Sequence, residues 1–429
     1  MAQLDLPDGS TTPPSVSHSP YAVLKNPDYA RFLLAGMAAT IGGQMQSVAV
    51  GWELYERTRS ATALGLVGLA QVLPVILLAI PAGHAADRYS RKGQIIVAIG
   101  LMACASAGLA LISWFQGPIE LAYLCLVLTG IGQAVYNPAR WAILTQVVPR
   151  ELVASAVTWN SSSWQTGATA GPALGGLVIA LTRGATTAYV CDCFCSILAV
   201  ILILPIRLRP FERSGEPFSM GSLLAGIRFV YSSRLILGTI TLDLFAVFLG
   251  GATALLPIFA RDILQIGPTG LGWLRAAPSI GAFAMAFALA HRPPLRRAGP
   301  ALMWSVAGFG LATIVFGLST NAYLSFVMLF FTGAFDNISV VVRSTLIQML
   351  TPDAMRGRVS AVNAIFIGSS NELGEFESGM AARFFGAVAA VVGGGIGTIV
   401  VVVAVSAIWP SLLKLGALHD VGKTDDPVV

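Results

Sequence analysis

Residues 83–114 read GHAADRYSRKGQIIVAIGLMACASAGLALISW, a short basic segment followed by an apolar run. The run over residues 94–114 contains no charged side chain. About 20 apolar residues in an α-helix are enough to span the hydrocarbon core of a bilayer. Because a helix satisfies its own backbone hydrogen bonds in lipid, this segment predicts a membrane-spanning helix.

The same pattern extends over the whole chain. Of its 429 residues 55% are hydrophobic and 11% are charged, whereas soluble proteins carry about 25% charged residues. Recurring apolar segments predict an all-α membrane protein with twelve transmembrane helices. The predicted spans are residues 30–55, 62–83, 94–114, 119–141, 154–181, 186–206, 235–258, 269–290, 299–318, 322–345, 357–384 and 387–410.

Lys and Arg are distributed unevenly over the loops between these spans. Of the 26 in the chain, 20 fall on the side that holds both termini. The opposite side holds the other six: Arg57, Arg59, Arg183, Arg261, Arg275 and Arg383. Since cytoplasmic loops carry the excess of Lys and Arg, both termini are predicted to be cytoplasmic. The net charge of +5 follows from this bias. Membrane lipids, and no nucleic acid, are therefore expected as partners.

The two halves of the chain repeat one another. An offset of 203 residues aligns seven identities: Thr129, Gly130, Arg140, Pro149, Asn160, Gly171 and Gly176 with Thr332, Gly333, Arg343, Pro352, Asn363, Gly374 and Gly379. An offset of 207 aligns Thr62, Leu64, Gly65 and His84 with Thr269, Leu271, Gly272 and His291. These identities predict two pseudo-symmetric six-helix halves of parallel topology, the layout of alternating-access transporters.

The predicted domains follow from the spans and the repeat. Residues 1–22 are rich in Pro, Ser and Thr and predict a disordered cytoplasmic tail. The N-terminal half covers 23–206, a cytoplasmic linker with an amphipathic helix covers 207–234, and the C-terminal half covers 235–415. A second cytoplasmic tail is expected over 416–429.

Two motifs indicate a family. GHAADRYSRK (residues 83–92) resembles the loop signature of the major facilitator superfamily, with Ser90 in place of its second glycine. GATAGPALGG (residues 167–176) resembles the antiporter motif of that superfamily. GWELYERTRSATALGLVGLAQVLPV and ALLPIFARDIL are similar to its bacterial branch of enterobactin-exporter-like transmembrane secretion effectors. The matched residues are Gly83, Asp87, Arg88, Arg91 and Lys92 in the loop and Gly167, Gly171, Pro172, Gly175 and Gly176 in span five.

The resemblance implies roles for these residues. Asp87 is expected to contact Arg140 and the positive N-terminal end of span eleven, which would latch the halves on the cytoplasmic side. Arg88, Arg91 and Lys92 are expected to set topology and contact anionic lipid. The glycines and Pro172 would kink span five and allow close helix approach, with simple packing as the alternative.

Ionisable residues inside the spans are the candidates for ion coupling. A charge at the bilayer centre costs roughly 2.5–3.5 kcal/mol, so such residues are expected to face the interior. Glu372 and Glu375 lie on one helical stripe, whereas Glu377 is about 140° around from Glu372. We expect the Glu372/Glu375 pair to bind a proton, with a structural polar network as the alternative.

Two aspartates and several amides complete the candidate set. Asp243 and Asp336 are coupling candidates or structural partners, and Asp336 could pair with Arg343. Glu53 and Asp192 are expected at the membrane interface. The resemblance implies a substrate cavity lined by spans one, four, seven and ten. Its polar candidates are Gln44, Gln46, Gln133, Asn137 and Asn337, each of which could instead bond a neighbouring helix.

The predicted function is secondary active export of a small molecule, siderophore-like or drug-like, coupled to protons or another ion. It would occur by alternating access in a bacterial inner membrane. The alternatives are an uptake carrier or uniporter, and a non-transporting sensor or scaffold. The sequence has no HExxH, nucleophile elbow or phosphate-binding loop, so an enzyme, a cofactor and a metal are not expected. A monomer is expected.

Overall fold

A computed structural model describes residues 21–208, 220–292 and 297–416 of the chain, and these residues contain helices and no strands. The predicted tails, except for their innermost residues, lie outside the described residues. The N-terminal half consists of α1 (Pro27–Thr58), α2 (Ala61–Arg88), α3 (Arg91–Trp114), α4 (Ile119–Val147), α5 (Val153–Thr182) and α6 (Thr186–Ile203).

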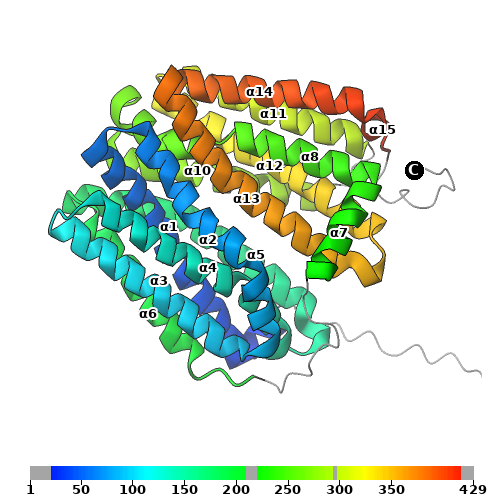
Figure 1. Ribbon diagram of the computed structural model, residues 1–429, viewed down its shortest axis with the longest axis horizontal. Coiled ribbons are helices and arrows are strands. Elements are labelled where there is room, and N and C mark those ends of the chain that lie inside the picture. Colours follow the sequence, from blue (N-terminus) through cyan, green and yellow to red (C-terminus); the bar gives the residue numbers. More distant parts are fainter. Residues whose placement is uncertain (1–20, 209–219, 293–296, 417–429) are drawn as a thin grey trace, which may run out of the picture.

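The C-terminal half repeats this arrangement. Its long helices are α8 (Arg234–Leu249), α10 (Gly267–Ala290), α11 (Ala298–Leu318), α12 (Ala322–Leu350), α13 (Asp353–Phe385) and α14 (Ala387–Ile408). The short helices α7 (Met220–Ser232) and α15 (Pro410–Leu413) flank it. Figure 1 shows α1–α6 in the lower part of the view and α8–α14 in the upper part, so the two six-helix halves are distinct bodies.

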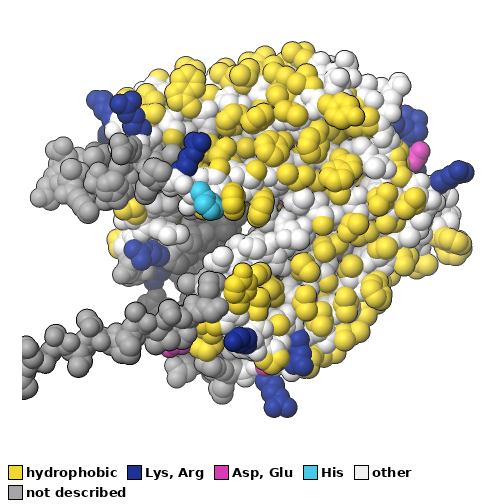
Figure 2. All heavy atoms as spheres, turned by 180° about the vertical axis from the view of Figure 1, so that it is seen from behind, with side chains coloured by type: hydrophobic (Ala, Val, Ile, Leu, Met, Phe, Trp, Pro, Cys, Tyr) yellow, Lys and Arg dark blue, Asp and Glu magenta, His cyan; other side chains and the backbone are white. Residues whose placement is uncertain are grey.

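The described helices account for all twelve predicted spans. Ten helical segments are long and apolar enough to cross a membrane. The other two predicted spans, α5 and α13, are long enough at 30 and 33 residues but are not among these ten. They pack against the opposite half, α5 on α10 and α13 on α2, which removes part of their surface from lipid. Figure 2 shows hydrophobic side chains over the middle of one face and Lys and Arg toward its ends, as a bilayer requires.

The seventh span is not the single helix that we predicted over residues 235–258. Helix α8 ends at Leu249, and Gly250 and Gly251 interrupt it. The chain continues as a 3-10 turn (Ala252–Leu255), a short helix α9 (Leu256–Ile258) and a π-helical turn (Phe259–Ile263). Irregular backbone at membrane depth is tolerated where protein covers it or a cavity borders it. The prediction failed because the run on either side of Gly250 and Gly251 is mostly apolar and offers no signal for a break.

Two glycine contacts hold the halves together, and the sequence repeat relates them. A Cβ on Gly379 of α13 would lie 2.6 Å from the Cα of Gly65 on α2. A Cβ on Gly176 of α5 would lie 2.9 Å from the Cα of Gly272 on α10. The offsets 203 and 207 pair Gly176 with Gly379 and Gly65 with Gly272. The α2–α13 and α5–α10 contacts are therefore equivalent under the pseudo-symmetry.

The bundle has two ends. Because twelve spans are crossed, both ends of the described chain lie at one end, called the terminal end below. The end where α1 meets α2 is called the distal end. A cluster of buried apolar side chains includes Leu54 of α1 together with Leu255 and Phe259 of the C-terminal half. It packs the halves against each other toward the distal end.

Candidate functional site

Glu372 and Glu375 face a cavity of about 50 Å3 between the two halves. Helices α1 and α2 contribute one wall, and α10, α13 and the broken seventh span contribute the other. The lining residues are Ser47, Gly51, Leu64, Val67, Gln71, Ala254, Pro257, Arg275, Glu372 and Glu375. The stripe predicted from helical periodicity places both carboxylates here, and Glu377 is not among these residues.

Arg275 is a cavity residue that the sequence did not identify as part of the candidate site. It was assigned to an outer loop, but it lies inside α10 and lines the same cavity as the two glutamates. Its Nη2 donates a hydrogen bond of 2.7 Å to Oγ of Ser47 on α1. Thr253 donates a hydrogen bond of 3.4 Å to Oε1 of Glu375. The sequence did hold a signal for Arg275, because position 275 falls within the predicted span 269–290 and a charge inside a span is a candidate functional residue.

The cavity holds three ionisable groups in a small volume. None of the ion pairs among the described residues joins Arg275 to Glu372 or Glu375 within 4.0 Å. With both carboxylates ionised the site carries a net charge of −1, and one proton makes it neutral. Uncompensated charge is costly in a poorly solvated site, which favours binding of one proton by the carboxylate pair.

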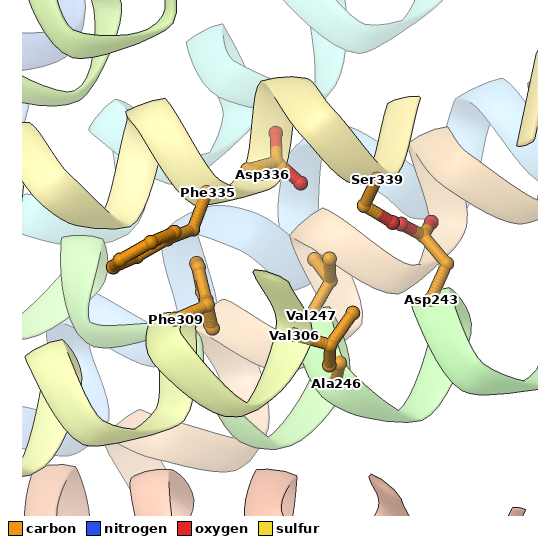
Figure 3. A pocket seen from close by; sticks show the side chains of 8 residues that line it. All are labelled: Asp243, Ala246, Val247, Val306, Phe309, Phe335, Asp336 and Ser339. Carbon is orange, nitrogen blue, oxygen red and sulfur yellow. The ribbon is translucent and has the colours of Figure 1, made fainter. Parts of the chain in front are cut away.

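Asp336 and Asp243 have different surroundings. Asp336 borders a cavity of about 150 Å3 in the C-terminal half, together with Gly250, Gly251 and Thr253 of the broken span. Figure 3 shows Asp336 on α12 and Asp243 on the facing helix, both lining a smaller cavity. Arg343 forms its ion pair with Asp243 and not with Asp336, the partner that spacing along the helix left open. Sequence spacing on one helix could not reveal the partner on α8.

Asp192 is buried rather than interfacial, so that prediction is wrong. Its side chain is 4% exposed and accepts a hydrogen bond from Ser106 of α3. Gln46 donates a bond of 3.2 Å to the same hydroxyl. Gln46, predicted to line the substrate cavity, thus joins α1 to α3 and α6 inside the N-terminal half. Glu53 is half-buried and bonds Arg57 at 3.4 Å.

The remaining amide candidates do not line the cavities described above. Gln44 packs against Gly171 of α5, because a Cβ added at Gly171 would lie 2.6 Å from the Cβ of Gln44. Gln133 and Asn337 are half-buried, and Asn137 is exposed. Their role in substrate binding stays a prediction.

The antiporter-like motif lies between two helices. Gly167, Gly171 and Gly175 pack against α1, and Gly176 packs against α10. The carbonyl oxygen of Pro172 would lie 2.5 Å from a Cβ on Gly272. The motif therefore forms part of the contact between halves.

The residues that match the loop signature, positions 83–92, lie at the terminal end. Gly83 is in the last turns of α2, but the side chains of Asp87 and Arg88 lie outside the described residues. Arg140 donates a 3.0 Å bond to Asn160 and lies over the Tyr136 ring.

Two basic residues of this loop begin α3. Arg91 is its half-buried first residue. Lys92 donates to the carbonyl oxygens of Leu204 and Ile206, so it ties α3 to the end of α6. This bonding differs from the lipid contact that we expected of Lys92.

A polar cluster joins the halves at the distal end. Arg261 pairs with Glu56 at 3.2 Å, and Arg59 pairs with Asp262 at 3.2 Å. Tyr55 donates a hydrogen bond to Asp262. Tyr55 and Glu56 lie in the last turn of α1, Arg59 follows it directly, and their partners belong to the π-helical turn. The sequence predicted loops at these two arginines but not their acidic partners in the opposite half.

Comparisons with known proteins agree with this architecture. A family profile described as transmembrane secretion effector matches residues 18–417. The multidrug efflux pump Tap of Mycobacterium tuberculosis is 27% identical over 359 residues, covering 80% of this chain and 84% of that protein. The enterobactin exporter EntS of Escherichia coli is 27% identical over 338 residues, covering 79% of this chain and 81% of that protein.

Solved structures show the same fold at low sequence identity. A bacterial homologue of the human lysosomal transporter Spinster, inward-facing and unoccupied, gives a TM-score of 0.70 at 17% identity, covering 91% of this chain and 98% of that one. The nucleoside transporter NupG gives a TM-score of 0.70 at 13% identity, covering 89% and 99%. These relatives and structural neighbours are membrane transporters, not enzymes.

Proposed function

The chain belongs to the transmembrane secretion effector family of the major facilitator superfamily, and from this premise we propose that it is a proton-coupled exporter of a small molecule. The substrate is siderophore-like or drug-like, in keeping with the relatives named as an enterobactin exporter and a multidrug efflux pump. The protein lies in a bacterial inner membrane with both termini in the cytoplasm, as the distribution of Lys and Arg favours.

One observation carries the proposal: Glu372 and Glu375 share a cavity with Arg275 between the two halves. Such a site, at the interface of two repeats, is where transporters of this layout bind coupling ions. A proton that enters from the distal side neutralises the site, and its release on the other side restores the charge. Intramembrane carboxylates of this kind are typical of proton relays.

Transport between two states also requires contacts that can separate. The distal cluster joins the halves through exposed or half-buried ion pairs, which contribute little individually and can exchange for water. The glycine contacts at α2–α13 and α5–α10 let backbones approach closely and rotate against each other. Asp336 and Asp243 are secondary candidates for the proton site, and the buried ion pair of Asp243 favours a structural role for it.

Inverted membrane vesicles test the direction and the energy source. Ethidium serves as a drug-like probe and enterobactin as a siderophore probe, each offered outside vesicles with an imposed acid-inside pH gradient. We expect accumulation of at least one probe that stops when an ionophore collapses the gradient. Vesicles lacking the protein are the control. Accumulation that is indifferent to the pH gradient would contradict proton coupling, and accumulation only in right-side-out vesicles would contradict export.

A further inference from the structure

Arg275 is held by the half of the molecule to which it does not belong. The guanidinium lies on α10 of the C-terminal half, and its hydrogen bond goes to Ser47 on α1 of the N-terminal half. Glu372 and Glu375, the two anionic groups of the cavity, lie on α13 in the same half as Arg275. A single cation thus lines one cavity with a hydrogen-bond acceptor in each half, Ser47 in one and the carboxylate pair in the other.

The charged groups that face Arg275 are few. Of the described residues lining the cavity, the titratable ones are Arg275, Glu372 and Glu375. The other polar groups nearby are uncharged: Ser47 on α1, Gln71 on α2 and Thr253 on the 3-10 turn. The charge in this cavity that can change with proton binding is therefore that of the carboxylate pair.

A contact of Arg275 with an ionised carboxylate is expected to be stronger than its contact with Ser47. A hydrogen bond from a guanidinium to a carboxylate is roughly twice as strong as one between neutral groups, and it is frequently bidentate. A serine hydroxyl accepts from Arg275 as a neutral partner. A Glu372/Glu375 pair with both carboxylates ionised should therefore outcompete Ser47. A proton bound by the pair removes one of its two charges and shifts the preference of Arg275 toward Ser47.

We propose that Arg275 is the positioning residue that exchanges between Ser47 and the Glu372/Glu375 pair, so that proton binding forms a contact between the halves and proton release breaks it. This inference rests on the proposed function, which places the proton on the same pair. The Arg275–Ser47 bond seen in the structure corresponds to the protonated state. The exchange transmits the protonation state from α13 through α10 to α1, whose distal end carries Tyr55 and Glu56.

Ser47→Ala removes the acceptor with a small change in volume, and Ser47→Thr keeps a hydroxyl at that position. Arg275→Lys keeps the positive charge without the guanidinium fork. The readout is the distance between spin labels at Phe115 and Tyr323, which are 74% and 85% exposed at the distal end of opposite halves. The full chain, with its five native cysteines replaced, is reconstituted and measured at acidic and alkaline pH by double electron–electron resonance.

For the chain with native Ser47 and for Ser47→Thr we expect two distance populations whose ratio changes with pH. In Ser47→Ala and Arg275→Lys that pH-dependent change should shrink about tenfold, the expected effect of losing a hydrogen bond to a charged group. Glu372→Gln combined with Glu375→Gln should hold the acidic distribution at every pH. A structural role for Arg275 would shift both distributions equally and leave their pH dependence intact.

Ethidium-driven proton flux, followed with pyranine trapped in proteoliposomes, distinguishes failure of the Arg275 exchange from failure of the proposed function. If the double glutamate variant loses flux but Ser47→Ala and Arg275→Lys retain the full pH-dependent change in distance, the exchange is overturned and the proposed function stands. If the double glutamate variant keeps its flux, the proposed function fails, and the exchange fails with it. Loss of flux together with loss of the pH-dependent change supports both.

Discussion

A buried charge inside the bundle depends on a single partner residue. Asp243 and Arg343 are 6% and 3% exposed and form an ion pair between α8 and α12. Removing two charges from water is expensive, and their mutual attraction compensates only while both are present. Loss of one partner therefore leaves an uncompensated charge, whereas loss of both can be nearly neutral.

Asp243→Ala should destabilise the protein by about 3–5 kcal/mol, because Arg343 would remain buried without its partner. Combining it with Arg343→Met should restore most of that loss. Unfolding in detergent, followed by denaturant titration, gives both free energies. Asp28→Ala is the control, since its pair with Arg31 is partly exposed and should matter by less than about 1 kcal/mol. Equal stability of Asp243→Ala and the control would refute the role of the pair.

What the sequence could predict at this scale depended on distance along the chain. Glu372 and Glu375 lie three residues apart on one helix, so periodicity alone predicted that they share a face. The partners of Arg343 and Asp192 come from other helices, and no spacing rule identifies them. Arg275 was misplaced because the charge count assigned it to a loop rather than to the span that contains it.

Helices α2 and α13 approach closely because both carry glycine where they meet. A Cβ on Gly379 would lie 2.6 Å from the Cα of Gly65 and 2.8 Å from the carbonyl oxygen of Ala61. Both neighbours are backbone atoms, so neither can move without shifting a helix. Gly368 lies on the same stripe of α13, and a Cβ there would meet nothing within 4 Å.

Gly379→Ala should push α2 and α13 apart and cost about 1–3 kcal/mol of stability, with a parallel loss of transport. Gly368→Ala should be neutral or slightly stabilising, because alanine favours a helix over glycine by up to about 1 kcal/mol. Melting temperature and ethidium export from cells report the two effects. Identical behaviour of the two variants would show that the glycine contact between halves does not limit transport.

The membrane-spanning helices were easier to predict from the sequence than the break within one of them. Each apolar run of about 20 residues predicted a span, because lipid imposes that length on a helix. The break at Gly250 and Gly251 escaped prediction since glycine is common in membrane helices and the run around it stays apolar. The packing of α5 and α13 on the opposite half is a tertiary contact, and the apolar runs could not predict it.

The whole molecule consists of two bodies that meet along two equivalent helix pairs and one distal polar cluster. The repeat predicted the two bodies and even related their contact glycines. It could not predict the cluster, because Arg261 and Asp262 lie in a turn of the broken seventh span that has no counterpart among the aligned identities. That cluster is asymmetric and lies where the halves must separate for a distal opening.

Glu56→Gln together with Asp262→Asn should weaken the distal cluster and favour the state that opens there. A cysteine at Ala254, which is 6% exposed beside the central cavity, reports the opening by its reaction with a membrane-impermeant maleimide. We expect labelling from the distal side to rise about two- to fivefold, in keeping with the modest strength of exposed ion pairs. Asp28→Asn at the terminal end is the matched control, and an equal rise there would contradict the assignment.

Transport depends, in the function proposed, on a proton that moves on Glu372 and Glu375. The most direct measurement of this movement is proton flux into proteoliposomes, read from trapped pyranine, when a gradient of ethidium or enterobactin is imposed. The protein with native glutamates and the Glu377→Gln variant, whose substitution lies on the same helix away from the cavity, should show substrate-driven flux. Glu372→Gln combined with Glu375→Gln should show none, although the protein still binds the probe. Undiminished substrate-driven flux in that double variant would contradict proton coupling at this carboxylate pair.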